Sequence, residues 1–190
     1  LVMIGTGILW FGWFGFNAGS AGAANGQAVQ ALLNTFLAAA AGMVGWLATE
    51  KLRDGQATSL GAASGVVAAL VAITPASGYV DPAGALAIGV IAGIVCYWGA
   101  TSLKHMFGYD DSLDVFAVHG LGGITGAILS GVFAVEAIGG TPGGLEGNWG
   151  QVLTQIYGIG STIMYCAVAT AVLMLVIKAT MGIRVEDDEE

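Results

Sequence analysis

Charged residues are scarce in this sequence of 190 residues: they make up 9% of the chain, whereas hydrophobic residues make up 56%. Soluble domains carry about 25% charged residues, so a chain of this composition is not built to face water on its outside. The mean hydropathy of +0.80 agrees with this. Lysine and arginine together number five and form no basic patch, so we expect no nucleic-acid partner.

Cysteine and proline are also rare, with two and three residues. Cys96 and Cys166 stand alone in apolar runs and fit neither a CxxC motif nor a disulfide framework, so we expect two buried side chains. The 32 glycines show no collagen-like period. In apolar segments they are typical of helices that pack closely in a bilayer, and four GxxxG pairs indicate the same, at Gly15/Gly19, Gly61/Gly65, Gly89/Gly93 and Gly122/Gly126.

Long charge-free runs predict membrane-spanning helices, each of which needs about 20 apolar residues. The polar stretch NAGSAGAANGQAVQ divides the first run, which is too long for one span. The sequence therefore predicts an all-α, polytopic membrane helical bundle at 1–185, followed by an acidic tail at 186–190. Its six expected transmembrane helices lie near residues 1–19, 27–49, 59–77, 83–104, 113–134 and 152–178.

The basic residues predict how these helices are oriented. Lys51 and Arg53 follow the second expected span, Lys104 the fourth, and Lys178 and Arg184 the sixth. All of them fall on one side, which the positive-inside rule makes cytoplasmic. We therefore expect a multi-pass protein of the cell membrane with its C-terminus in the cytoplasm. The opening stretch LVMIGTGILWFGWF has no initiator Met or charged n-region, so it is no signal peptide, and we expect natural sequence upstream of it.

A histidine lies inside the fifth expected span, in the stretch DVFAVHGLGG at 114–123. On an α-helix the neighbours of His119 one turn away are Val115, Phe116, Gly122 and Gly123, which make a narrow, apolar face. A neutral imidazole there can hydrogen-bond a small polar molecule in transit or relay a proton. It can equally be structural, with both nitrogens bonded by neighbouring helices. No second ligand lies one turn away, so we predict no metal site.

Asp114 begins the same expected helix. With Asp111 as N-cap it occupies the third helical position, where the helix dipole favours a carboxylate. We prefer this role to catalysis, and the carboxylate could also tie the start of the helix to a neighbour. An intramembrane enzyme is disfavoured, because Asp114 and His119 lie about 140° apart on an α-helix and no Ser or Cys nucleophile accompanies them.

The first expected span carries an aromatic stripe, since Trp13, Phe16 and Ser20 recur at helical spacing. Two rings beneath a hydroxyl can stabilise a cation at an entrance. The alternative is an aromatic belt at the membrane interface, and the surrounding glycines favour the cation site. We expect Asn17 to make an interhelical hydrogen bond instead.

These stretches resemble the second half of ammonium transporters of the Amt/Mep/Rh family. The motifs that carry the resemblance are GWFGFNAGSA, SLGAASG…ITPASGYV, GALAIGVIAG and DDSLDVFAVHGLGGI. The motif with Asn17 and Ser20 is similar to the Amt branch. The resemblance implies spans six to eleven of an eleven-span fold whose first ten helices form two inverted repeats. It also implies homotrimers with one pore in each subunit.

The resemblance also assigns roles to single residues. His119 matches the second of two pore histidines, and Val115 matches an apolar side chain beside it. Phe16 matches the gating phenylalanine under the external ammonium site, Ser20 the hydroxyl of that site, and Trp13 an aromatic residue of the pore. The first pore histidine would lie in a first half that this chain lacks, so we expect the chain to be part of a longer subunit or one piece of a split chain.

The function implied is selective ammonium uptake, with methylammonium as an analogue, through a hydrophobic pore in the lipid bilayer. It requires neither a cofactor nor catalytic residues. The stretch GIRV at 182–185 resembles the start of a tail that helps to dock PII-type regulatory proteins. A second hypothesis is a receptor, in which an Amt-like domain senses ammonium for an attached signalling module.

Overall fold

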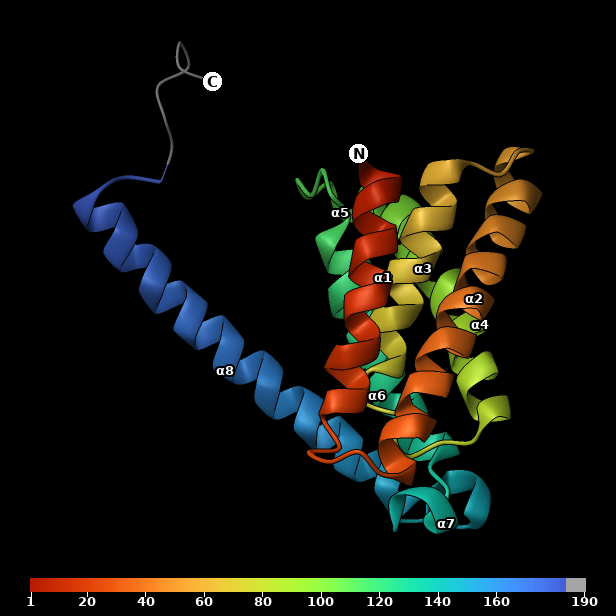
Figure 1. The fold of residues 1–190 in the computed structure, drawn as a ribbon. Coiled ribbons are helices and arrows are strands. Elements are labelled where there is room, and N and C mark those ends of the chain that lie inside the picture. The colour runs from red at the N-terminus through yellow and green to blue at the C-terminus, as the bar shows by residue number, and fades with distance from the viewer. Residues whose placement is uncertain (184–190) are drawn as a thin grey trace. The chain divides into compact units, whose positions relative to one another are not determined.

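The computed structural model describes residues 1–183, and the residues from Arg184 onward lie outside it (Figure 1). The described part is helical, with one isolated antiparallel bridge between Val80 and Ala134. The longer helices are α1 (Val2–Gly19), α2 (Gly26–Asp54), α3 (Ser59–Ile73), α4 (Pro82–Trp98), α6 (Gly122–Phe133) and α8 (Gly150–Thr180). The shorter elements are η1 (Gly99–Leu103), α5 (Lys104–Phe107), η2 (Phe116–Leu121), α7 (Glu136–Gly139) and η3 (Gly144–Glu146).

The helices lie where the hydropathy pattern predicts them, which confirms the all-α fold class. Within residues 1–183, four helices are long and apolar enough to cross a membrane: Gly26–Asp54, Pro82–Phe107, Phe116–Phe133 and Gly150–Thr180. Helix α3 is apolar but shorter, with 15 residues, and α1 is not among the four. The protein is therefore a multi-pass membrane protein, and the count of six crossings stays a prediction.

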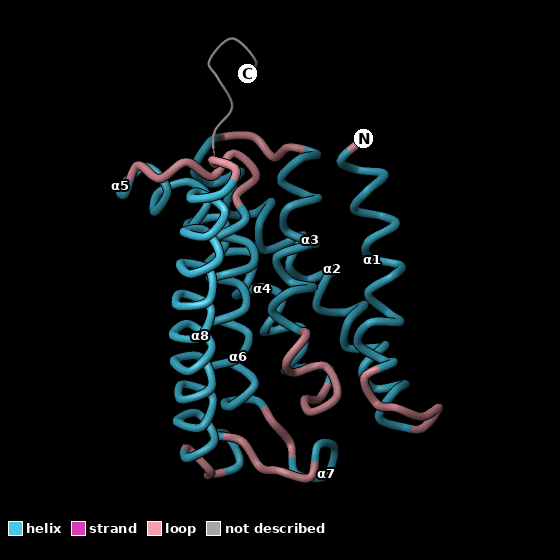
Figure 2. Tube along the Cα trace, turned by 90° about the vertical axis from the view of Figure 1, so that its left-hand side faces the viewer, coloured by secondary structure: helices cyan, strands magenta, loops and turns pink. Residues whose placement is uncertain are grey.

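Side-chain caps explain where three of the helices begin. The side chains of Asn25, Thr58 and Asp81 accept hydrogen bonds from the backbone N–H groups of the third residue on, at 3.0, 2.9 and 2.7 Å. Each cap pairs an N–H group that has no partner within its helix. Figure 2 shows the resulting connections at the ends of the helices.

Residues 1–155 form one compact unit and a second begins at Ile156. Glycines let the helices of the first unit touch backbone to backbone. A Cβ at Gly89 of α4 would collide with the carbonyl oxygen of Ala38 in α2, and one at Gly65 of α3 would lie 2.8 Å from the carbonyl oxygen of Gly42. A Cβ at Gly126 of α6 would likewise collide with the backbone of Ala72. Three of the four GxxxG pairs thus contain a glycine at a backbone contact.

Two details differ from the sequence-based expectations. A Cβ at Gly15 or Gly19 of α1 would meet no atom within 4 Å, so this pair makes no close contact within the described residues. Cys96 is buried as expected, but Cys166 is exposed. Cys166 lies on α8, and the second unit contains no other described helix to cover it. The domain boundary expected after residue 185 lies outside the described residues.

We predict that Gly89→Ala destabilises the protein by about 1–3 kcal/mol, the usual cost of overpacking. The added methyl group has to push against the backbone of Ala38, which is fully buried and has no flexible side chain to move aside. Gly26→Ala is the matched control, because a Cβ there meets nothing within 4 Å. Equal free energies of unfolding for the two variants, measured in detergent on the complete protein, would contradict this account.

Candidate functional site

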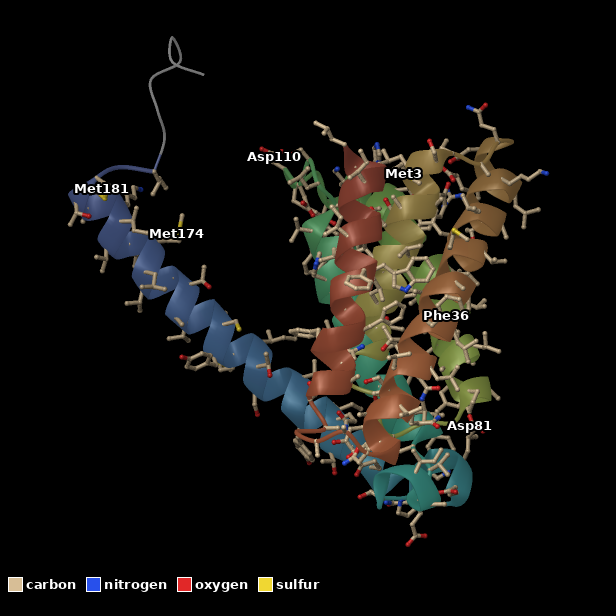
Figure 3. The ribbon with its side chains drawn as sticks, in the orientation of Figure 1. Met3, Phe36, Asp81, Asp110, Met174 and Met181 are labelled. Atoms are coloured by element: carbon tan, nitrogen blue, oxygen red, sulfur yellow. The ribbon has the colours of Figure 1, made fainter. Side chains whose placement is uncertain are left out.

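Two pockets lie along helices α1 and α3, towards their opposite ends. The Ser20 pocket has a volume of about 110 Å³ and is lined by Asn17, Ser20, Ala21, Gln27, Ala31, Thr74, Ser77, Gly78 and Tyr79. The His119 pocket has about 140 Å³ and is lined by Val2, Thr6, Ala63, Ser64, Val67, Leu113, Val118 and His119. Figure 3 shows Met3 of α1 and Asp110, which precedes η2, at one end of the first unit, with Asp81 near the other end.

The separation of the two pockets follows from helix geometry. In α1, Thr6 lines one pocket and Asn17 the other, and eleven residues of α-helix rise about 16 Å. In α3 and the turn after it, Ser64 lines the His119 pocket and Thr74 lines the Ser20 pocket. The sequence therefore places one set of polar side chains at each end of an apolar helix pair.

Trp13 lies between the two sets and is held in place by hydrogen bonding. Its indole N–H donates to Thr74 Oγ1 at 2.8 Å, and the Thr74 hydroxyl donates to the carbonyl oxygen of Leu70 at 2.7 Å. The Trp13 ring meets Phe16 edge to face, with centroids 5.7 Å apart. Phe16 does not line the Ser20 pocket, and 65% of it is exposed in this chain. The predicted aromatic stripe thus brings Trp13 and Phe16 into contact.

The hydroxyl hydrogen of Ser20 is bonded within α1. Its hydroxyl donates to the carbonyl oxygen of Phe16 at 2.9 Å, so only its lone pairs remain for a ligand. Because its hydrogen is already bonded to Phe16, this hydroxyl can accept a hydrogen bond from a ligand but has none to donate to it, which suits a ligand that carries only donors. Next to it, buried Asn17 donates to Thr35 of α2 at 2.9 Å. This is an interhelical hydrogen bond, and it ties α1 to α2 beside the pocket.

His119 does not lie on a regular α-helix, as the spacing argument assumed. It belongs to the π-helix η2 (Phe116–Leu121), whose wider turn changes which residues lie beside the ring. Its pocket is shared with Thr6, Ser64 and Leu113, whereas Val115 does not line it and is 51% exposed. Within residues 1–183 neither ring nitrogen of His119 makes a hydrogen bond, so no bond from a neighbouring helix holds the ring there.

The expected position of Asp114 is wrong. It precedes the helix, with φ of +54°, a left-handed conformation that the sequence spacing did not indicate. The helix starts later than expected because the Asp111 carboxylate accepts hydrogen bonds from the N–H groups of Val115 and Phe116, at 2.9 and 2.8 Å. The carboxylate of Asp114 is bonded to Lys104 at 2.9 Å, so it does tie the helix to a neighbour.

The two backbone hydrogen bonds, with that from Phe116 the stronger influence, hold the pKa of Asp111 below its ordinary value. The stabilisation that this carboxylate contributes is therefore present above its unfolded-state pKa and is lost as pH falls through the lowered one. At neutral pH the start of η2 is thus capped by an ionised group.

The described part of the chain contains no cluster of side chains that could hold a metal ion. No group of three or more His, Cys, Asp or Glu side chains gathers within residues 1–183. The polar atoms of both pockets come mainly from hydroxyl, amide and imidazole groups. Such groups can hydrogen-bond a small polar solute.

Comparison with known proteins identifies the family. The model of the Ammonium Transporter Family matches residues 1–190. The chain belongs to this family. An ammonium transporter of Aquifex aeolicus is 54% identical over 190 residues, which cover all of this chain and 45% of that protein. One of Mycobacterium tuberculosis is 47% identical over 197 residues, covering 100% of this chain and 41% of that protein.

Solved structures agree with this assignment to the ammonium transporters. Saccharomyces cerevisiae Mep2 superposes with a TM-score of 0.91 at 36% identity, over 97% of this chain and 43% of Mep2. A structure titled Sensor Amt Protein has a TM-score of 0.89 at 30% identity, over 98% of this chain and 45% of that chain. The resemblance read from the sequence motifs is thereby confirmed, and the chain spans less than half the length of these relatives.

Several pocket residues of this ammonium transporter chain were not predicted from the sequence. Thr74, Thr6 and Ser64 line the pockets, but a hydroxyl in an apolar helix most often bonds its own backbone and gives no separate signal. The pair of Lys104 and Asp114 carried a weak signal, because a lone base ends one span and a run of acids opens the next.

We predict that Thr74→Val in the complete transporter lowers the uptake of methylammonium about fivefold, since a lost hydrogen bond costs about 1 kcal/mol. Valine keeps the shape of threonine but leaves the Trp13 N–H without its acceptor. Thr74→Ser, which keeps the hydroxyl, should retain most of the activity. Equal uptake by the Val and Ser variants would show that the hydrogen bond to Trp13 has no part in transport.

Proposed function

We propose that the complete protein carries ammonium across the cell membrane through a pore that this chain lines in part. The observation that carries the proposal is the pair of pockets along α1 and α3, each with polar side chains in its lining and with Trp13 between them, in a chain of this family. The names of its relatives, ammonium transporters, support the same substrate.

The proposed route starts at Ser20. A cation that leaves water for hydrocarbon loses its hydration at a high cost in free energy. Lone pairs of Ser20 and the π-faces of Trp13 and Phe16 would offset part of that cost at the external mouth. Deprotonation before or within the pore lowers the cost further, because ammonia is neutral.

Ammonia would then pass His119, which offers a donor or an acceptor depending on its tautomer. Val115 contributes to the apolar wall beside it in the complete pore. Potassium has no proton to release and therefore cannot shed its charge, which explains selectivity without a dedicated filter. Transport of this kind needs no cofactor and no catalytic residue, and methylammonium should follow ammonium as an analogue.

We further propose the assembly that the family resemblance implies. The complete subunit would have eleven spans in two inverted repeats plus a final helix, with residues 1–185 belonging to the transmembrane domain. It would form a homotrimer in the lipid bilayer, with its C-terminus in the cytoplasm and available to a PII-type regulator. Large apolar side chains exposed on α1, among them Ile4, Ile8 and Phe11, support burial of this helix against protein or lipid.

A second candidate function is ammonium sensing, which the likeness to a structure titled Sensor Amt Protein supports. A sensor would use the same pockets to bind ammonium and would pass the signal to an attached domain. The gene sequence beyond Glu190 distinguishes the two functions, because a kinase or cyclase domain there would indicate the sensor.

We predict that His119→Ala in the complete protein lowers methylammonium uptake about fivefold, the effect of losing one hydrogen bond of about 1 kcal/mol. Discrimination against potassium should weaken as well, because alanine leaves more room for a hydrated ion. His105→Ala is the matched control, because this histidine is exposed on α5, outside both pockets. Wild-type uptake and selectivity for His119→Ala would count against the proposed route.

A further inference from the structure

One ion pair joins the two segments that lead to and from the His119 pocket. Lys104 is the first residue of α5 and directly follows the π-helix η1. Asp114 directly precedes the helix that contains η2. Their side chains meet at 2.9 Å, with 28% of the lysine and 37% of the aspartate side chain exposed. The pair therefore closes the loop between two neighbouring helices.

The backbone conformation of Asp114 determines the positions of Leu113 before it and of the turn that leads to His119 after it. Its φ of +54° is a left-handed conformation, which an L-residue adopts at a cost unless its surroundings hold it there. On one side Leu113 lines the His119 pocket. On the other side the carbonyl oxygen of Asp114 accepts from the N–H of Val118 at 2.9 Å, in the turn that leads to His119. A change at Asp114 would therefore move both Leu113 and His119.

Lys104 is itself fixed relative to η2 by packing. Gly99, the first residue of η1, is buried, and a Cβ there would collide with the Leu121 side chain and lie 3.1 Å from that of Ala117. Both contacted residues belong to η2. The two π-helices thus touch without room for a methyl group, and the lysine that follows η1 is placed at the start of the helix that carries His119.

Asp111 does not replace Asp114 in this arrangement. Its carboxylate is occupied by the N–H groups of Val115 and Phe116. It therefore caps the helix, while Asp114 makes the contact with α5. At the start of the helix, the Asp111 carboxylate thus contacts backbone groups, and the Asp114 carboxylate contacts a side chain.

We propose that Lys104 is a positioning residue for transport: by holding Asp114 in its left-handed conformation, it sets the width of the His119 pocket between Leu113 and the imidazole. This inference rests on the proposed function of ammonium transport. It assigns a role in the inner half of the route to a residue outside both pockets. It also predicts that the ion pair affects passage and leaves binding at Ser20 alone.

The test measures methylammonium uptake by the complete protein in proteoliposomes. We expect Lys104→Met to lower the maximal rate about fivefold while changing the KM less than about twofold, because the interaction lost acts after binding. Lys104→Arg, which keeps the charge, should restore the rate. Lys51→Met is the control, since Lys51 is exposed and forms no salt bridge within residues 1–183.

A double variant, Lys104→Met with Asp114→Asn, keeps the proposal testable if the single variant fails to fold, because it leaves no unpaired charge. We expect it to show the same loss of maximal rate as Lys104→Met. A wild-type rate for either variant, or an equal loss in Lys104→Arg, would overturn the inference. Absence of uptake by the wild-type protein would instead contradict the proposed function, so the two failures are distinguishable.

Discussion

Backbone contact between glycine-rich helices is the constraint on which the rest of this structure depends. Lipid tails are as apolar as leucine side chains, so helices in a bilayer gain little from hiding apolar surface from one another. Close approach must supply the attraction, and Gly89, Gly65 and Gly126 provide it by letting backbones meet. Buried alanines fill the remaining space of this core, including Ala38, Ala69, Ala72 and Ala92.

A rigid core of this kind fixes the positions of the polar side chains that line the two pockets. Thr74 extends from the end of α3, and its position fixes the Trp13 indole, which in turn faces Phe16. Asn17 anchors the same stretch of α1 to α2. At the other end of the bundle, the contact between η1 and η2 fixes the position of the helix segment that carries His119. Each pocket is therefore held by helices whose separation the core determines.

The sequence predicts the helices well and the site only in part. Charge-free runs and capping residues such as Asn25 and Asp81 locate helices because burial and hydrogen bonding act locally. The π-helix around His119 could not be foreseen, and neither could the left-handed Asp114 before it or the contact with η1, because contacts between segments distant in the sequence are not visible in the local pattern. The exposure of Phe16 and Val115 was likewise not foreseen, because the sequence pattern does not indicate which helix face the rest of the chain leaves uncovered.

The division of polar groups between two pockets has a simple physical meaning. The Ser20 pocket offers lone pairs and lies beside aromatic rings, an environment for a cation, whereas the His119 pocket is lined mainly by apolar side chains and suits a neutral molecule. A solute that can lose a proton between them meets a favourable environment at each stage. Ammonium is such a solute, and the two pockets are consistent with its transport by this family.

The most direct test of this account is the uptake of ammonium by the complete wild-type protein in proteoliposomes, followed by internal pH and by potassium flux. The account predicts that ammonium changes the internal pH while potassium, at the same concentration, does not enter. Equal entry of both cations, or no response to ammonium, would contradict it.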